Sequence, residues 1–128
     1  MLTELEPLRT YLLAKAATTE EQPFGPDALV FKVMGKMFAL VAWQQVPLRI
    51  SLKCDPYLAE LLRTTYAAVT PGYHLNKRHW NTVVLDGSIP EAEIAEMVDA
   101  SYELVVKGLK KGDRERLQRN GHGQQAGW

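Results

Sequence analysis

The chain has 128 residues and a mass of 14.4 kDa, which fits a single domain. Its 46% apolar and 23% charged residues exclude wholesale disorder. The single cysteine, Cys54, excludes a disulfide framework and a multi-cysteine metal centre within one chain, and it favours a cytoplasmic protein. The sequence shows no basic-then-apolar leader and no run of about 18 apolar residues, so we expect neither export by that route nor a membrane span.

The charges cancel in total but are segregated along the chain. Lys and Arg number 15, and so do Asp and Glu. The net charge is −3 over residues 1–31, +5 over 32–80, −6 over 81–106 and +4 over 107–128. A neutral total argues against a strong non-specific polyanion binder, but the basic middle permits one basic face. Clustering by chance is the alternative explanation of the same pattern.

The first half of the chain predicts a helix followed by a strand meander. Residues 3–16 carry leucines at helical spacing, and Thr3 with Glu6 matches a capping box. Residues 17–28 are polar with Pro and Gly breakers and predict a loop. Three strands are expected next, over residues 29–34, 37–43 and 48–53. Gly35 predicts a type II′ hairpin turn between the first two.

The third of these strands alternates cleanly between apolar and polar side chains. Leu48, Ile50 and Leu52 occupy one face, and they alternate with Arg49, Ser51 and Lys53 on the other. Because side chains along a strand point to opposite faces in turn, the pattern predicts one dry and one wet face of the sheet.

The second half of the chain predicts a helix, a strand and a longer helix. Asp55 caps a helix that begins at Pro56, and Leu58, Leu61, Leu62 and Tyr66 are expected to form its buried stripe. Residues 67–79 predict a loop, with a short strand possible near 73–75, and residues 80–85 predict a strand. A long helix follows from Pro90 to about residue 109, with an apolar face opposite a row of acids.

This order of elements predicts an α+β fold. We expect a two-layer sandwich in which one antiparallel sheet packs its dry face on the helices. Residues 1–110 are expected to form the single domain. Residues 111–128 lack apolar periodicity and end Gly-rich, so they predict a basic, flexible tail.

The densest group of chemically distinctive residues lies within 73–88. His74 and His79 have no nearby carboxylate or Cys, so they predict no metal site. Lys77 and Arg78 form either a solvated turn or a phosphate clamp. Motifs for phosphate-binding loops, dinucleotide binding and hydrolases are absent from the sequence. We therefore expect no catalytic residue, no metal and no cofactor, and we expect Cys54 to be an inert buried side chain.

Two stretches resemble a known family. Residues 51–63, SLKCDPYLAELLR, and residues 73–105, which open YHLNKRHWNTVVLDG, resemble the MmcQ/YjbR family of small bacterial proteins. The resemblance covers residues 1 to about 110 and implies a CyaY-like fold, similar to frataxin. It also implies DNA binding, through a "double wing" likeness to the C-terminal domain of a phage transcription factor. The first helix offers only Glu4 and Glu6, so the iron chemistry of frataxin is not expected.

Three functional hypotheses follow. In the first, the chain is a DNA-binding protein, possibly an accessory transcription regulator, that contacts duplex through a basic sheet and loop face. Its candidate site residues are Lys32, Lys36, Arg49, Lys53, His74, Asn76, Lys77, Arg78, Trp80 and Asn81. In the second, the same sheet face binds a protein partner, with Trp80 as the anchor. In the third, the chain is an enzyme that works through His74, Lys77 or His79. Cations gathered on one face would favour the first hypothesis, and scattered cations would favour the second. The oligomeric state is left open.

Overall fold

The computed structural model describes residues 1–126, with side chains described through Arg119. Within these residues, six strands form one antiparallel sheet in the order β1-β2-β3-β4-β6-β5. The strands are β1 (Thr18–Glu21), β2 (Leu29–Val33), β3 (Lys36–Ala42), β4 (Arg49–Lys53), β5 (Val69–Pro71) and β6 (Trp80–Val84). The helices are α1 (Leu5–Leu13), α2 (Pro56–Thr65), α3 (Glu91–Lys107) and α4 (Lys111–Ala126). The predicted α+β class is confirmed.

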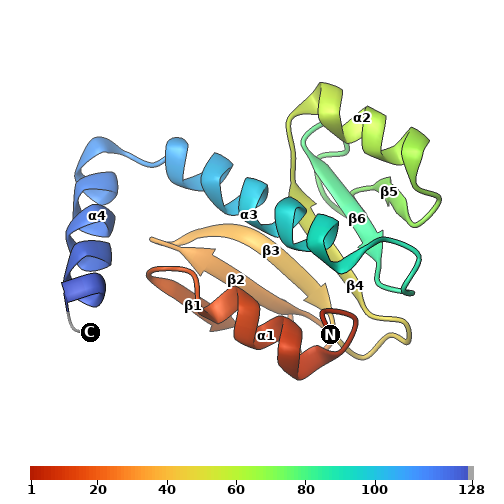
Figure 1. The fold of residues 1–128 in the computed structure, drawn as a ribbon, viewed down its shortest axis with the longest axis horizontal. Helices are drawn as coiled ribbons and strands as arrows, with labels where there is room; N and C mark the ends of the chain where they lie inside the picture. The colour runs from red at the N-terminus through yellow and green to blue at the C-terminus, as the bar shows by residue number, and fades with distance from the viewer. Residues whose placement is uncertain (127–128) are drawn as a thin grey trace.

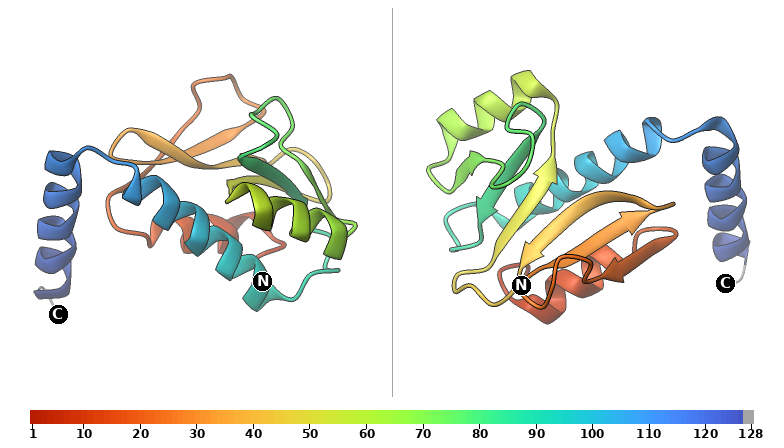
Figure 2. Two further views of the ribbon diagram at one scale, coloured as in Figure 1. Left: turned by 90° about the horizontal axis from the view of Figure 1, so that it is seen from above. Right: turned by 180° about the vertical axis from the view of Figure 1, so that it is seen from behind.

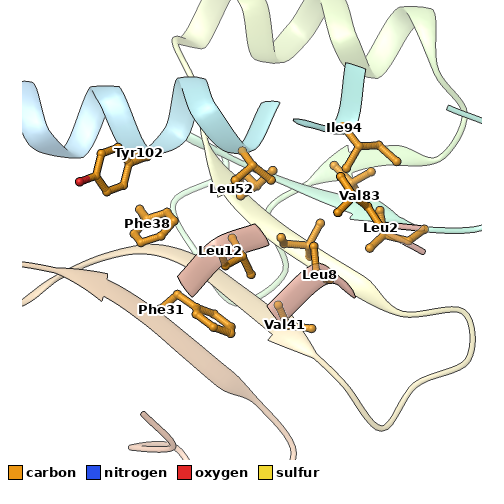
Figure 3. Close-up of a cluster of buried hydrophobic side chains, with 14 of the residues drawn as sticks. Leu2, Leu8, Leu12, Phe31, Phe38, Val41, Leu52, Val83, Ile94 and Tyr102 are labelled. Carbon is orange, nitrogen blue, oxygen red and sulfur yellow. The ribbon is translucent and has the colours of Figure 1, made fainter. Parts of the chain in front are cut away.

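Helices α1, α2 and α3 lie on one side of the sheet (Figures 1 and 2). Helix α3 crosses β3 and β4, while α2 packs on β5 and β6. The core lies between the two layers and includes Phe31, Phe38 and Ile50, none of which is exposed (Figure 3 draws part of this cluster). A two-layer sandwich with helices on one face of an antiparallel sheet is the predicted architecture, and it leaves the other face of the sheet without a helix.

Two short strands replace segments that the sequence predicts as loop. Strand β1 pairs with β2, with Thr18 opposite Val33, and β5 pairs with β6, with Val69 opposite Val83. They are the two edge strands of the sheet. The hairpin between β2 and β3 also differs from the expectation, because Met34 and Gly35 both have positive φ, of 49° and 82°. Positive φ at both central residues defines a type I′ turn rather than type II′.

Helix α2 begins as predicted but buries a different face. The Asp55 side chain accepts hydrogen bonds from the backbone N–H groups of Tyr57 and Leu58, as a helix cap does. The fully buried residue of the helix is Ala59. Leu58 is 41% exposed and Leu61 is 60% exposed, so the expected leucine stripe is wrong for these two residues.

The segment after residue 110 is helical through Ala126 rather than an irregular tail. Leu117 is buried and belongs to the core cluster, so this segment contributes a side chain to the domain. In Figure 1, α4 follows the C-terminal end of α3 and lies to one side of the sheet. The last part of the expected tail, residues 127–128, lies outside the described residues. Whether the segment is flexible stays a prediction.

Candidate nucleic-acid interface

The helix-free face of the sheet presents cations beside a tryptophan. In the β4–β6 ladder, Lys53 lies opposite Trp80 and Arg49 lies opposite Val84. Directly opposed residues share a face, and neighbours along a strand alternate, so Arg49, Lys53 and Trp80 lie on the face opposite to buried Ile50 and Leu52. The predicted dry face is confirmed, but the predicted wet face is only partly so, because Ser51 is 4% exposed and its hydroxyl bonds to that of Thr82 beneath the 72–79 loop.

Lys32 extends this set across the sheet. It lies between core residues Phe31 and Val33 on β2, and it points to the helix-free side. There its Nζ lies 3.5 Å from a carboxylate oxygen of Glu21. Strands β2 and β4 are separated only by β3, so Lys32 stands roughly 10 Å across the face from the Lys53 end of β4, whereas Arg49, which pairs with Ala42, lies farther along the strands.

Two loops rise on either side of this face. The β1–β2 loop, residues 22–28, and the β5–β6 loop, residues 72–79, both project on the side of the sheet away from the helices (Figure 2, left). The first is fixed by Trp43, whose Nε1 donates to the carbonyl of Pro26 at 2.7 Å. Each loop displays an aromatic side chain that is 70% exposed, Phe24 on the first and Tyr73 on the second.

The 72–79 loop is tied closely to the sheet. The Tyr73 N–H donates to Oγ1 of Thr82 at 3.0 Å, and the Gly72 N–H donates to the carbonyl of Trp80 at 2.8 Å. A Cβ at Gly72 would lie 2.7 Å from Cβ of Trp80, so only glycine permits this approach. His74 contacts Tyr73, with ring centroids 4.0 Å apart and ring planes tilted by 50°.

Arg63 of α2 holds the base of the same loop. Its guanidinium donates to Oδ1 of Asn81 at 2.7 Å, to the carbonyl of Trp80 at 3.2 Å and to the carbonyl of Lys77. Three acceptors on one planar donor group fix the path of the chain from Lys77 to Asn81. The position of Trp80 is therefore set from both the sheet and α2.

The structure gathers only part of the candidate cations. Lys32, Arg49 and Lys53 share the helix-free face, whereas Lys36 lies opposite the core residue Val33 at the hairpin and so belongs to the other side of the sheet. Lys77 and Arg78 are exposed on the 72–79 loop. Arg78 lines a hollow together with Tyr57, Glu60 and Arg63, so it faces the outer side of α2 rather than the sheet.

The two candidate asparagines are already engaged. Oδ1 of Asn76 accepts from the Arg78 N–H at 2.9 Å, which shapes the loop. Asn81 is 3% exposed on the helix side, where its amide nitrogen donates to the carbonyl of Ala59 at 3.3 Å. Its neighbour Trp80 takes the opposite face, so both residues cannot meet one ligand. We therefore leave Asn81 out of the candidate interface.

The acids of the predicted α3 row lie on the other side of the sheet. Asp99 accepts hydrogen bonds from Tyr11 at 2.7 Å and from Lys15, and these bonds lower its pKa although burial alone would raise it. Within residues 1–119, Arg49 and Lys53 form no ion pair, and neither do Glu93, Glu96 and Glu103. The molecule thus places unpaired cations on its sheet face and unpaired acids on its helix face.

The other sequence candidates for chemistry are placed as follows. Burial raises the pKa of the Cys54 thiol, and the charge of Asp55 raises it further. Among the described residues, no three side chains of His, Cys, Asp or Glu come together as a metal site. The cavities we describe are not lined by His74 or His79. In the part of the chain that the structure describes, no helix has the length and apolar character needed to cross a membrane.

The fold and this face define a small α+β protein whose sheet carries helices on one side and only loops on the other. Comparison with protein families gives a more specific result, because the model of the YjbR family matches residues 13–104. The chain belongs to the YjbR family, as the resemblance of its motifs implies. The uncharacterized protein YjbR of Escherichia coli K12 is 41% identical over 110 residues, which cover 86% of this chain and 93% of that protein. The uncharacterized protein YyaQ of Bacillus subtilis is 32% identical over 76 residues, covering 59% of this chain and 63% of that protein.

Solved structures agree with the fold. The crystal structure of the Deinococcus radiodurans protein DR2400, described as a DUF419 domain, is 41% identical and has a TM-score of 0.86. The match covers 91% of this chain and 89% of that one. A crystal structure from Pseudomonas syringae is 29% identical with a TM-score of 0.69, covering 79% and 97% of the two chains.

Sequence reasoning missed the exposed aromatic residues of the two loops. Phe24 lies in a segment with neither helical nor strand periodicity, flanked by Pro23 and Gly25. An apolar aromatic residue in such a segment has no element to bury it, and this signal could have marked it. Tyr73 was within the candidate stretch but was not chosen as a site residue.

Proposed function

We propose that this protein binds duplex DNA through the helix-free face of its sheet and the two loops beside it, and that it acts as an accessory regulator of transcription in the bacterial cytoplasm. Lys32, Arg49 and Lys53 contact phosphates, and Lys77 extends the contact from the loop, with Arg78 at the outer edge toward α2. Trp80, Tyr73, His74 and Phe24 meet the sugar and base edges, with Asn76 at the periphery. Phosphate contacts set the position of the protein on the duplex.

The observation that carries the proposal is the separation of charge between the two faces of the sheet. Arg49 and Lys53 are unpaired within residues 1–119, and Lys53 lies opposite Trp80, while Glu93, Glu96 and Glu103 lie on α3 behind the sheet. A duplex would approach the first face and be repelled from the second. The neutral total charge favours modest affinity with marked salt dependence.

The test is a titration of labelled random duplex DNA at several salt concentrations. The variant Arg49→Ala with Lys53→Ala removes two phosphate contacts, so the slope of log K against log salt should become shallower by about 1.8 units. Lys77→Ala with Arg78→Ala should weaken binding in the same way and to a similar extent on all sequences, because phosphate contacts do not read bases.

The matched control is Lys110→Ala with Lys111→Ala, which removes two exposed cations away from the proposed face. This variant should keep the slope of the parent chain. Absence of binding by the parent at low salt would refute DNA binding outright. An unchanged slope in the Arg49 and Lys53 variant, with a shallower slope in the control, would move the basic contact to residues 107–119.

A protein partner on the same face is the second candidate function. Trp80 is half-buried, its backbone is held by Arg63 and Gly72, and Lys53 lies opposite it, so it would serve as an aromatic anchor with a cation at its rim. A protein partner would require Trp80 without requiring the salt slope. Loss of partner binding in Trp80→Ala, together with no DNA binding by the parent, would favour this alternative.

A further inference from the structure

A long apolar groove runs between α2 and α3 on the helix side of the molecule. Its main part has a volume of about 380 Å³. Leu52 and Val83 of the sheet form the floor, Leu58, Leu61 and Leu62 line the α2 side, and Met97 and Ala100 line the α3 side. A second hollow shares Cys54, Leu58 and Ala100 with the first and continues the groove toward Leu104 and Lys107.

The groove exists because the two helices pack on different strands. Helix α2 contacts β5 and β6, whereas α3 contacts β2, β3 and β4. The apolar side of α2 therefore faces the gap instead of the core, which explains why Leu58 and Leu61 are 41% and 60% exposed. Exposed leucines beside an apolar groove are typical of an interaction site.

The α3 wall of the groove carries three glutamates and, at its far end, Lys107, while Lys53 borders the groove from β4, so acids outnumber cations along it. Glu93, Glu96 and Glu103 line it at helical spacing, next to Met97, Ala100 and Leu104. These three carboxylates form no ion pair within residues 1–119. An occupant that complements this site has apolar side chains for the leucine wall and cations for the glutamate wall.

The length of the groove favours a helix over a compact small molecule as its occupant. The α3 residues that line it run from Glu93 to Lys107, a rise of about 21 Å along the helix. This length corresponds to nearly four turns of an accompanying helix and exceeds what one compact small molecule spans. An amphipathic helix that lays its apolar stripe into a hydrophobic groove is a recurrent mode of peptide recognition.

We propose that the α2–α3 groove binds an amphipathic helix of a partner protein, with leucine-type side chains against Leu58, Leu61 and Leu62 and with Lys or Arg facing Glu93, Glu96 and Glu103. The site lies on the helix side of the sheet and the proposed DNA interface on the other side, and the two adjoin at Lys53, which also borders the groove. The proposal stands whether or not the sheet face binds DNA.

The test uses a synthetic 18-residue peptide of Leu and Lys in which the leucines follow the i, i+3, i+4, i+7 pattern. Its affinity for the full chain is measured by fluorescence anisotropy, and the contacted residues are mapped by NMR chemical-shift changes. A matched peptide carries Glu in place of every Lys. We expect the Leu/Lys peptide to shift the resonances of α2 and α3 and to bind at least about tenfold more tightly than the Leu/Glu peptide.

Variants then test the two walls separately. Leu58→Ser with Leu61→Ser should weaken binding of the Leu/Lys peptide about tenfold or more. Its matched control is Leu13→Ser with Val46→Ser. These two apolar residues are 40% and 96% exposed and lie outside the groove, so their replacement should leave the affinity unchanged. Glu93→Gln with Glu96→Gln should reduce the salt dependence of binding. Circular dichroism confirms that each variant is folded.

Several results would overturn the proposal. They are equal affinity for the Leu/Lys and Leu/Glu peptides, resonance shifts confined to the sheet face or to α4, and unchanged affinity in the folded Leu58 and Leu61 variant. Saturable binding of dodecylammonium at the same α2 and α3 resonances, without peptide binding, would also refute it and would assign the groove to a small cationic amphiphile. Because NMR mapping uses the unmodified chain, the proposal can fail even if a variant does not fold.

Discussion

The hydroxyl of Ser101 joins helix α3 to the sheet at the point where two strands separate. Its Oγ accepts from the backbone N–H of Lys53 at 2.8 Å and donates to the carbonyl of Phe38 at 2.6 Å. The last paired residues of β3 and β4 at this end are Ala39 and Leu52, so Phe38 and Lys53 would be the next pair. Ser101 is completely buried and supplies the partners that the ladder no longer provides.

The variant Ser101→Ala should therefore be destabilised by more than the loss of one ordinary hydrogen bond. It removes the Ser101 partner of the buried Phe38 carbonyl, at about 1–3 kcal/mol, and that of the half-buried Lys53 N–H, which adds a smaller cost. Urea unfolding of parent and variant measures the difference. The control is Thr10→Ala, which removes an exposed helical hydroxyl that bonds to the carbonyl of Glu6 and should change stability by less than about 0.5 kcal/mol. Equal stability of Ser101→Ala and the parent would mean that the strands close on each other without the hydroxyl.

At the scale of elements, helix α2 shows how a correct pattern can point to the wrong environment. Its leucines recur at helical spacing, which identifies the helix but not what lies opposite its apolar face. Helix α2 packs on the short edge strand β5 and on β6, and this places Leu61 beside the groove instead of in the core.

We accordingly expect Leu61→Ala to cost less than about 1 kcal/mol in the free energy of unfolding, because most of this side chain is already in water. The sequence pattern alone predicts a cost of about 2–5 kcal/mol, which is the usual cost of truncating a buried leucine to alanine. Leu12→Ala on α1 is the matched comparison, since Leu12 is 0% exposed and should show the full cost of about 2–5 kcal/mol. Denaturant unfolding decides, and a loss for Leu61→Ala as large as that for Leu12→Ala would show that the groove is closed in solution.

The elements that could be predicted are those whose own sequence buries a face. Strand β4 alternates between apolar and polar residues, β3 is apolar, and α3 separates apolar from acidic residues. In each of them the local sequence alone predicts which face is buried. Strand β1, with the sequence TTEE, carries no apolar residue. It exists because β2 offers free backbone groups to pair with, and this long-range cause leaves no local pattern. Strand β5 has only three residues and is held by β6 in the same way.

The candidate interface divides along the same line. The alternation of β4 was sufficient to place Arg49 and Lys53 on the wet face. Trp80 and Asn81 are neighbours on one strand, so the alternation of side chains along a strand already implies that they face opposite sides and cannot share one site. The turning of Arg78 toward α2 depends on the path of the loop that Arg63 fixes, which no local pattern encodes.

At the scale of the whole molecule, α4 is a polar helix with one apolar attachment. Leu117 is 7% exposed, while its described neighbours on the helix are mostly charged and exposed. Removal of residues 111–128 should therefore cost about 1.5–3 kcal/mol, which is the value of burying one leucine. The sequence alone predicts no cost.

Thermal and urea unfolding of the shortened chain test this expectation. Leu117→Ala in the full chain should account for most of the loss, whereas Arg119→Ala should have no measurable effect because its side chain is exposed. A shortened chain as stable as the parent would mean that Leu117 is not needed by the core and that residues 111–128 are dispensable for folding.

Arg63 connects the groove on the helix side of the molecule with the loop on the sheet face. It stands on α2, one wall of the groove, and it holds the carbonyls of Lys77 and Trp80, from which the sheet face takes its loop and its indole. A ligand that displaces α2 must stretch or break these hydrogen bonds. Its binding free energy therefore includes the cost of releasing the 72–79 loop from Arg63. Thermodynamic linkage is reciprocal, and whatever factor a groove ligand imposes on affinity at the sheet face, a sheet-face ligand imposes on the groove. One arginine would thus let an event on either side be sensed on the other without any movement of the sheet between them.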